Sequence, residues 1–224
     1  MRPTPPTNLK QLAQRANDLA GWTLADIASD YGIQMPENLK REKGWVGQLL
    51  EYALGADAQS RPEPDFTQLG VEMKTIPIDQ SGAPLETTYI CVAPRTGQAG
   101  VDWHRSLVYK KLAHVLWVPI EGERKIPLAE RRVGTPLLWQ PSQEEEAMLR
   151  ADWEELMELL TFGQPITARH GEYLQLRPKA ADGSVKTKAF DINGKPIQAQ
   201  PKGFYLKKSF TQLILNRAFI TGPI

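Results

Sequence analysis

The sequence has a single cysteine, Cys91, and no long apolar run among its 224 residues. One cysteine excludes an internal disulfide framework and any zinc site with two or more sulfur ligands from one chain. Because no stretch of about 18 apolar residues occurs, we expect no membrane-spanning helix. The first six residues lack the apolar core of a signal peptide, so we expect a cytoplasmic protein.

The chain also has almost no net charge, at +1 from 27 Lys and Arg against 26 Asp and Glu. The charges are unevenly distributed. Residues 165–224 contain ten basic and three acidic side chains, whereas residues 121–164 contain five basic and ten acidic ones. A basic C-terminal quarter predicts a local anion-binding face. The alternative is that these charges are spread around a solvated surface.

The spacing of apolar residues predicts a mixed α/β chain. Thr23 is a candidate helix N-cap, and Gly55 is a candidate helix stop. Helices followed by strands and then more helix and strand fit an α/β fold with a mixed central sheet flanked by helices. Helical spacing covers residues 8–20, 23–31, 44–54, 143–160 and 209–219, and strand patterns cover residues 69–76, 87–92, 114–120 and 173–177.

Residues 64–74 bring two carboxylates and a lysine close together in the sequence. Glu72 and Lys74 are two positions apart on a predicted strand, so their side chains point to the same face. Val71 and Met73 then point toward the core. A turn after Asp65 would return its carboxylate to the neighbourhood of Glu72.

Two carboxylates and a lysine suit the hydrolysis of a phosphodiester. Hard cations such as Mg²⁺ prefer oxygen ligands, and a bound metal polarises a phosphoryl oxygen and acidifies water. A lysine can stabilise developing negative charge or orient the attacking water. Glu51 adds another carboxylate on the preceding, mostly apolar helix. The alternatives are a surface ion pair at residues 72 and 74 and an ordinary helix-edge carboxylate at residue 51.

With Asp65, Glu72 and Lys74 in the motif positions, the sequence resembles the PD-(D/E)xK nucleases and, among these, the MutH family of mismatch-repair endonucleases. The similarity extends in order over nearly the whole chain, while residues 180–201 and both termini diverge. The similar blocks are residues 37–47, 69–77, 84–88, 115–117, 131–134, 136–139, 152–157, 166–175 and 203–208.

This resemblance implies one nuclease domain over residues 1–224, with a restriction-endonuclease-like fold and two lobes around a DNA-binding cleft. Residues 1–120 would be mainly catalytic, and residues 121–224 would mainly recognise DNA. The implied reaction nicks the unmethylated strand of hemimethylated GATC sites, 5′ to the G, with Mg²⁺ or Mn²⁺ in its place. Asp65 and Glu72 would hold the metal with help from Glu51, and Lys74 would position or activate the water.

The resemblance also implies how the DNA sequence is read. Arg177 lies in the matching recognition segment, where a bidentate arginine would contact a guanine edge. Tyr205 matches an aromatic residue that senses the adenine methyl group, since a rigid ring can reject one extra methyl. The alternatives are a solvent-exposed strand end for Arg177 and a core position for Tyr205. Further matching DNA-contact positions are Lys43, Tyr89, Lys111, Pro178 and Lys179.

The implied partners are double-stranded DNA with hemimethylated GATC sites and the activator MutL, which acts after MutS finds a mismatch. We expect a monomer in isolation. Two other functions stay open, a GATC restriction endonuclease that cuts both strands and a non-catalytic GATC- or partner-binding module. Chain length argues against the first, and the intact set of Asp65, Glu72 and Lys74 argues against the second, because charges gathered on one face cost free energy to keep.

Overall fold

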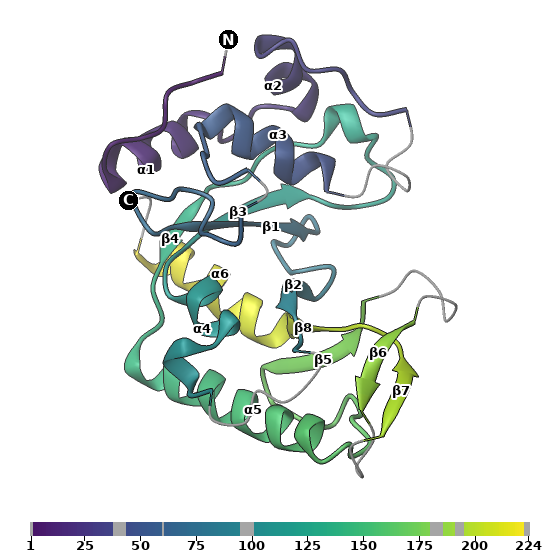
Figure 1. Ribbon diagram of the computed structural model, residues 1–224. Coiled ribbons are helices and arrows are strands. Elements are labelled where there is room, and N and C mark those ends of the chain that lie inside the picture. Colours follow the sequence, from purple (N-terminus) through teal and green to yellow (C-terminus); the bar gives the residue numbers. More distant parts are fainter. Residues whose placement is uncertain are drawn as a thin grey trace. The chain divides into compact units, whose positions relative to one another are not determined.

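The computed structural model describes residues 2–37, 44–59, 61–94, 101–179, 186–190 and 195–221. Contacts divide the chain into two compact units, each with its own three-stranded sheet (Figure 1). Both units are assembled from separate stretches of sequence. The expected functional division near residue 120 stays a prediction. The first unit comprises Met1–Glu86, His114–Gln140 and Gln212–Ile224, and the second comprises Thr87–Ala113 and Pro141–Thr211.

A mixed sheet is the central layer of the first unit. Strand β1 (Glu72–Ile78) pairs in parallel with β3 (Val115–Glu121), and β4 (Leu137–Trp139) pairs antiparallel with β3. Six of the seven residues of β3 are buried, as its continuous apolar run predicts for a central strand. Apolar side chains of three helices complete this core, namely α1 (Leu9–Asp18), α2 (Leu24–Asp30) and α3 (Trp45–Leu54). Residues Leu128–Glu130 form a short 3-10 helix, η2.

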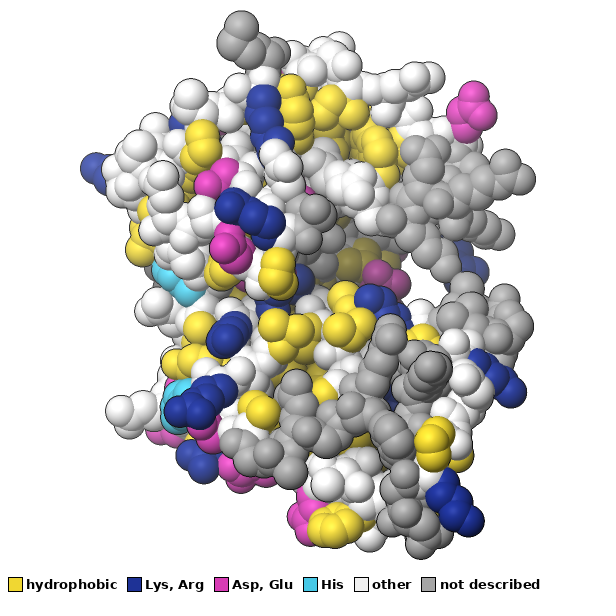
Figure 2. Space-filling model, viewed as in Figure 1, with side chains coloured by type: hydrophobic (Ala, Val, Ile, Leu, Met, Phe, Trp, Pro, Cys, Tyr) yellow, Lys and Arg dark blue, Asp and Glu magenta, His cyan; other side chains and the backbone are white. Residues whose placement is uncertain are grey.

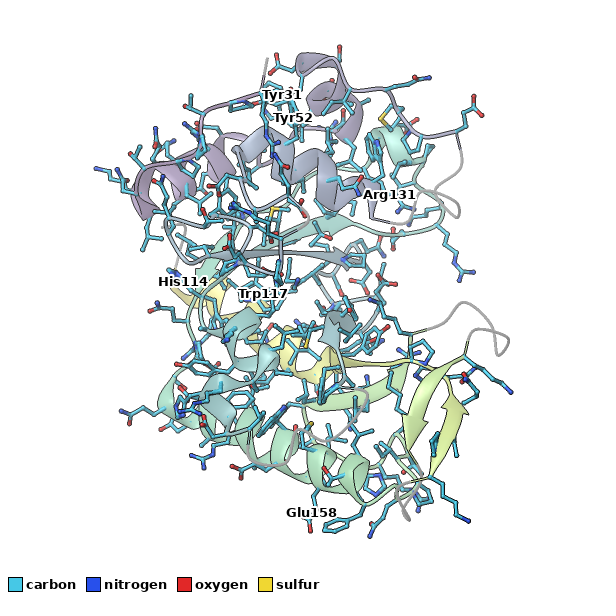
Figure 3. All side chains as sticks on the ribbon, viewed as in Figure 1. Tyr31, Tyr52, His114, Trp117, Arg131 and Glu158 are labelled. Carbon is cyan, nitrogen blue, oxygen red and sulfur yellow. The ribbon has the colours of Figure 1, made fainter. Side chains whose placement is uncertain are left out.

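Local capping interactions define the start of α2 and the end of α3 in the first unit. The Thr23 hydroxyl accepts the backbone N–H of Asp26 at 3.0 Å, and the Asp26 carboxylate accepts that of Thr23 at 3.2 Å, which closes a capping box on α2. Gly55, with φ of +81°, ends α3, so both sequence predictions are confirmed. The Tyr31 and Tyr52 rings then meet edge-to-face with centroids 5.9 Å apart, joining α2 to α3 (Figure 3).

An antiparallel sheet forms the middle of the second unit. Strand β8 (Lys202–Leu206) lies between β2 (Thr88–Val92) and β5 (Leu174–Pro178) and pairs with both. The long helix α5 (Gln143–Thr161) packs against β5, and α4 (Leu107–Leu112) packs against β2. The remaining bounds are Trp103–Arg105 for the 3-10 turn η1, Thr187–Phe190 for β6, Pro196–Ala199 for β7 and Lys208–Thr221 for α6.

The α/β class with mixed sheet and flanking helices is confirmed. One predicted boundary is wrong, because the strand expected from residue 69 begins at Glu72. Thr67–Gly70 forms a tight turn instead, with Gly70 at φ of +63°. Strand β8 was not predicted at all, although its neighbours β2 and β5 were. Among the described residues, no helix is long and apolar enough to cross a membrane.

Candidate active site and nucleic-acid interface

Glu72 and Lys74 form a largely buried ion pair on β1. The Lys74 Nζ lies 2.6 Å from Glu72 Oε1, and the two side chains are 16% and 4% exposed. Val71 and Met73, on either side of Glu72, are buried in the apolar core of the first unit. The strand alternation that predicted a shared face for Glu72 and Lys74 is therefore confirmed. Removing a charge from water costs free energy, and the attraction between Glu72 and Lys74 offsets part of that cost for both side chains.

Asp65 reaches this pair through a tight turn. The backbone N–H of Phe66 donates to the carbonyl of Val71 at 2.9 Å, and Phe66 is anchored in the core at 2% exposure. The chain therefore reverses just before β1. This reversal lets Asp65 Oδ2 accept the backbone N–H of Met73 at 2.8 Å. Met73 separates Glu72 from Lys74, so the Asp65 carboxylate lies against the backbone between the other two predicted residues.

Asp57 holds the turn that presents Asp65, a role that the sequence pattern did not indicate. Its carboxylate accepts the Thr67 backbone N–H at 2.9 Å and the Thr67 hydroxyl at 2.6 Å. Its own backbone N–H donates to the Asp65 carbonyl at 2.9 Å. Burial opposes the charge on Asp57, but the hydrogen bonds from Thr67 outweigh it and lower the pKa of this carboxyl.

The carboxylates have the chemistry that a divalent metal needs. Mg²⁺ takes one or two protein carboxylates and fills its remaining positions with water and substrate phosphate, and Mn²⁺ also suits oxygen ligands. Asp65 and Glu72 fit that requirement. Glu51 is half-buried on α3, which packs against β1, but its predicted ligand role stays a prediction. Within the described ranges, no three His, Cys, Asp or Glu side chains are arranged to hold a metal on their own.

A second cluster of predicted residues lies on the sheet of the second unit, and we call Tyr89, Arg177, Lys179 and Tyr205 the reader cluster. Tyr89 and Tyr205 face each other across β2 and β8, with ring centroids 5.3 Å apart in an edge-to-face arrangement. The Arg177 guanidinium lies 5.5 Å from the centre of the Tyr205 ring, and the Lys179 ammonium lies 4.6 Å from that of Tyr89. Each ring of the pair therefore has one cation close to it, a contact that cation–π attraction favours.

This environment changes how Tyr205 ionises. Burial raises the pKa of Tyr205, and the neighbouring Tyr89 adds to the rise, whereas the charges of Arg177 and Lys179 lower it. The alternative of a fully buried core position for Tyr205 is not what the structure shows, because the ring is half-buried. Arg177 is exposed, but it is not a loose strand end, since Thr87 Oγ1 accepts a hydrogen bond from its Nη1 at 2.8 Å.

Thr87 and Gly203 border the reader cluster, and neither was predicted. Gly203 is buried on β8, directly opposite Arg177 in the pairing with β5. A Cβ atom at residue 203 would lie 2.9 Å from Cε2 of Tyr89 and 3.3 Å from Cε2 of Tyr205. A glycine inside a strand is a sequence signal of close approach by another group, and it could have drawn attention to this position.

Helix α5 anchors the strand that carries Arg177. Asp152 is buried on α5, and its carboxylate accepts the backbone N–H groups of Glu172, Tyr173 and Leu174 at 2.8, 2.7 and 2.7 Å. Nearby, Glu155 accepts the backbone N–H of Gly171 at 2.9 Å. The entry to β5 is therefore fixed by charge-assisted hydrogen bonds, which are stronger than neutral ones.

The other predicted DNA contacts are less closely linked to this cluster. Pro178 ends β5 in an exposed position, and Lys111 is half-buried in the last turn of α4. Lys43 lies outside the described residues. Lys and Arg side chains occupy separate places on the face shown in Figure 2, with apolar and acidic side chains between them.

Comparison with known proteins gives relatives that match nearly the whole chain. A family model described as DNA mismatch repair enzyme MutH matches residues 54–152, which include Asp65, Glu72 and Lys74. DNA mismatch repair protein MutH of Yersinia enterocolitica is 59% identical over 220 residues, which are 97% of this chain and 96% of that protein. The protein of the same name from Vibrio parahaemolyticus is 57% identical over 98% of this chain and 98% of its own length. That from Escherichia coli is also 57% identical, over 97% of this chain and 96% of its own length.

Proposed function

This chain belongs to the MutH family of DNA mismatch repair enzymes, and we propose that it nicks the unmethylated strand of hemimethylated GATC sites, 5′ to the G, by metal-dependent hydrolysis. One observation supports the hydrolytic part above all. A turn and a strand bring the carboxylates of Asp65 and Glu72 and the ammonium of Lys74 to the same end of β1. Such a set has the ligands and the cation that phosphodiester cleavage requires.

The protein's own side chains divide the work at the scissile phosphate. Asp65 and Glu72 would hold Mg²⁺, which would polarise the phosphate and acidify a bound water. Lys74 is held in place by Glu72 at 2.6 Å, so its ammonium is oriented before the substrate arrives. We assign it the stabilisation of negative charge at the phosphate and the orientation of the attacking water. Glu51 would assist from α3.

Arg177 and Tyr205 of the reader cluster would supply sequence and methylation specificity. Arg177 would donate to the O6 and N7 atoms of guanine, the commonest specific contact in the major groove. Tyr205 would lie against the adenine N6 group, where one added methyl meets a rigid ring. Lys179, Lys111 and Lys43 would contact the phosphate backbone, which provides affinity without sequence information.

We extend the proposal to the regulatory partners implied by family membership. MutL would activate the enzyme after MutS finds a mismatch, and the protein would otherwise be a monomer with little activity. A weak resting activity is physically reasonable, because a nuclease that acted at every GATC site would damage the genome. Lid or domain closure on a partner is a general way to withhold activity.

Nicking of a hemimethylated GATC plasmid with Mg²⁺ tests this function. We expect the wild-type protein to cut only the unmethylated strand, faster with MutL, and Glu72→Ala and Lys74→Ala each to lose at least about 100-fold in rate. The chain offers a matched control. Glu123 and Lys125 have the same spacing and also form an ion pair, at 3.1 Å, but Lys125 is 67% exposed.

Glu123→Ala and Lys125→Ala should therefore keep the wild-type rate, and thermal denaturation should show that all four variants fold. Equal losses in both pairs would contradict the assigned site. Cutting of both strands without MutL would instead identify a restriction endonuclease. Binding to hemimethylated GATC without any cutting, even with MutL, would identify a binding module.

A further inference from the structure

Thr87 and Gly203 have no proposed contact with DNA, yet both lie against the residues that would contact its bases. We propose that they are positioning residues, which hold Arg177 and the two tyrosines of the reader cluster in a preformed arrangement before DNA binds. This inference rests on the proposed function, because it concerns how the same cluster distinguishes one base and one methyl group.

Thr87 restrains the Arg177 side chain. Arginine is long and flexible, and Arg177 is exposed, so its guanidinium would sample many positions without a partner. The Thr87 hydroxyl accepts one hydrogen bond from Nη1 at 2.8 Å, and the Tyr205 ring lies below the guanidinium at 5.5 Å. These two contacts restrain the position of the guanidinium. Its remaining N–H donors stay available for the paired contact that guanine recognition needs.

Gly203 leaves room for the tyrosine pair. On antiparallel strands, residues two apart share a face, so residue 203 points toward the same side as Tyr205. Arg177 lies directly across from it, and a Cβ atom would meet the Tyr89 ring at 2.9 Å and the Cys91 carbonyl oxygen at 3.2 Å. Carbonyl oxygens of a sheet cannot move easily, so the ring would have to shift. Any residue larger than glycine therefore displaces the aromatic pair.

Preorganisation matters here because methylated and unmethylated adenine differ very little in shape. Methylation of adenine adds one carbon, and a single methyl group is discriminated only when the surface that meets it cannot retreat. A ring held by a second ring, by a cation and by a close backbone is such a surface. Holding these side chains in advance also reduces the ordering cost of binding.

Matched substitutions separate positioning from chemistry. Thr87→Val removes the hydroxyl at nearly constant shape, whereas Thr87→Ser keeps it. We expect Thr87→Val to reduce the preference for a GATC duplex over an AATC duplex by about five- to tenfold, with Thr87→Ser within about twofold of wild type. Gly203→Ala should reduce the preference for unmethylated over fully methylated GATC. In a Tyr89→Ala background, the same Gly203→Ala change should have no further effect.

A spectroscopic measurement without DNA makes the outcome independent of nuclease activity. In NMR spectra, Thr87→Val should shift the Nε–H signal of Arg177, whereas Thr87→Ser should not. Gly203→Ala should shift the ring signals of Tyr89 and Tyr205. Unchanged spectra and unchanged preferences would overturn the positioning roles. If the spectra change as expected but the wild type shows no preference for GATC, the proposed function fails while the positioning roles stand.

Discussion

At the scale of single residues, two Glu–Lys pairs with the same spacing have very different surroundings. Glu72 and Lys74 are 4% and 16% exposed, whereas Glu123 and Lys125 are 20% and 67% exposed. Exposed pairs contribute little to stability and are screened by salt, while buried pairs demand a partner for each charge. The sequence pattern is the same in both cases, so burial is what makes the first pair a candidate for catalysis.

The ionisation of Tyr205 provides a residue-scale test of the reader cluster. Because the charge of Arg177 favours the phenolate, Arg177→Ala should raise the pKa of Tyr205 further above its ordinary value. Since burial already raises that pKa, the protonated ring contributes stability that is fully present below about pH 10 and is lost as pH rises through the folded-state pKa. A titration of the Tyr205 ring carbon by NMR measures the shift.

Arg150 is a suitable control for this titration. It is exposed on α5 and paired with Glu154 at 2.7 Å, and it is not among the charges that shift the pKa of Tyr205. Arg150→Ala should therefore leave the titration curve of Tyr205 unchanged. A curve that is unaffected by Arg177→Ala would mean that the guanidinium spends little time over the ring in solution.

At the scale of secondary-structure elements, Asp152 joins α5 to β5. Asp152→Ala would leave the backbone N–H groups of residues 172–174 without their acceptor inside the second unit. We expect it to lower the free energy of unfolding by about 3 kcal/mol, since unmet buried donors are costly. Glu154→Ala, two residues away on the exposed side, should change it by less than about 0.5 kcal/mol. Urea denaturation measures both, and equal effects would contradict the anchoring role.

Elements set by local pattern were predictable from the sequence, and elements set by distant pairing were not. The Thr23 N-cap of α2, the glycine stop of α3 and the buried β3 all follow from neighbouring residues. Strand β8 is five residues long and contains Gly203, so it has no alternating apolar pattern, and it is defined by pairing with β2 and β5. The same limit applies to the sites. The Glu72–Lys74 face is a local consequence of strand geometry, whereas Thr87 and Arg177 meet only in the folded sheet.

At the scale of the whole molecule, the small net charge of +1 conceals the uneven distribution of charge along the chain. DNA binding through lysine and arginine releases counterions, so affinity should fall steeply as salt increases. Lys179→Ala should weaken binding similarly for all DNA sequences and reduce the slope of log K against log salt by about one. Lys125→Ala should leave the slope unchanged. Fluorescence anisotropy across a salt series measures it, and an unchanged slope in Lys179→Ala would exclude that side chain from phosphate contact.

The central place of β8 in its sheet has a consequence for synthesis on the ribosome. Strands β2 and β5 hydrogen-bond to β8 and not to each other, so neither has a partner until residues 202–206 have left the exit tunnel. Strands β1, β3 and β4 can pair much earlier. The paired strands of the sheet that carries Glu72 and Lys74 are thus all synthesised before β8, the strand that joins β2 to β5. A premature stop codon between β4 and β8 would leave β1, β3 and β4 encoded but remove the strand to which both β2 and β5 hydrogen-bond.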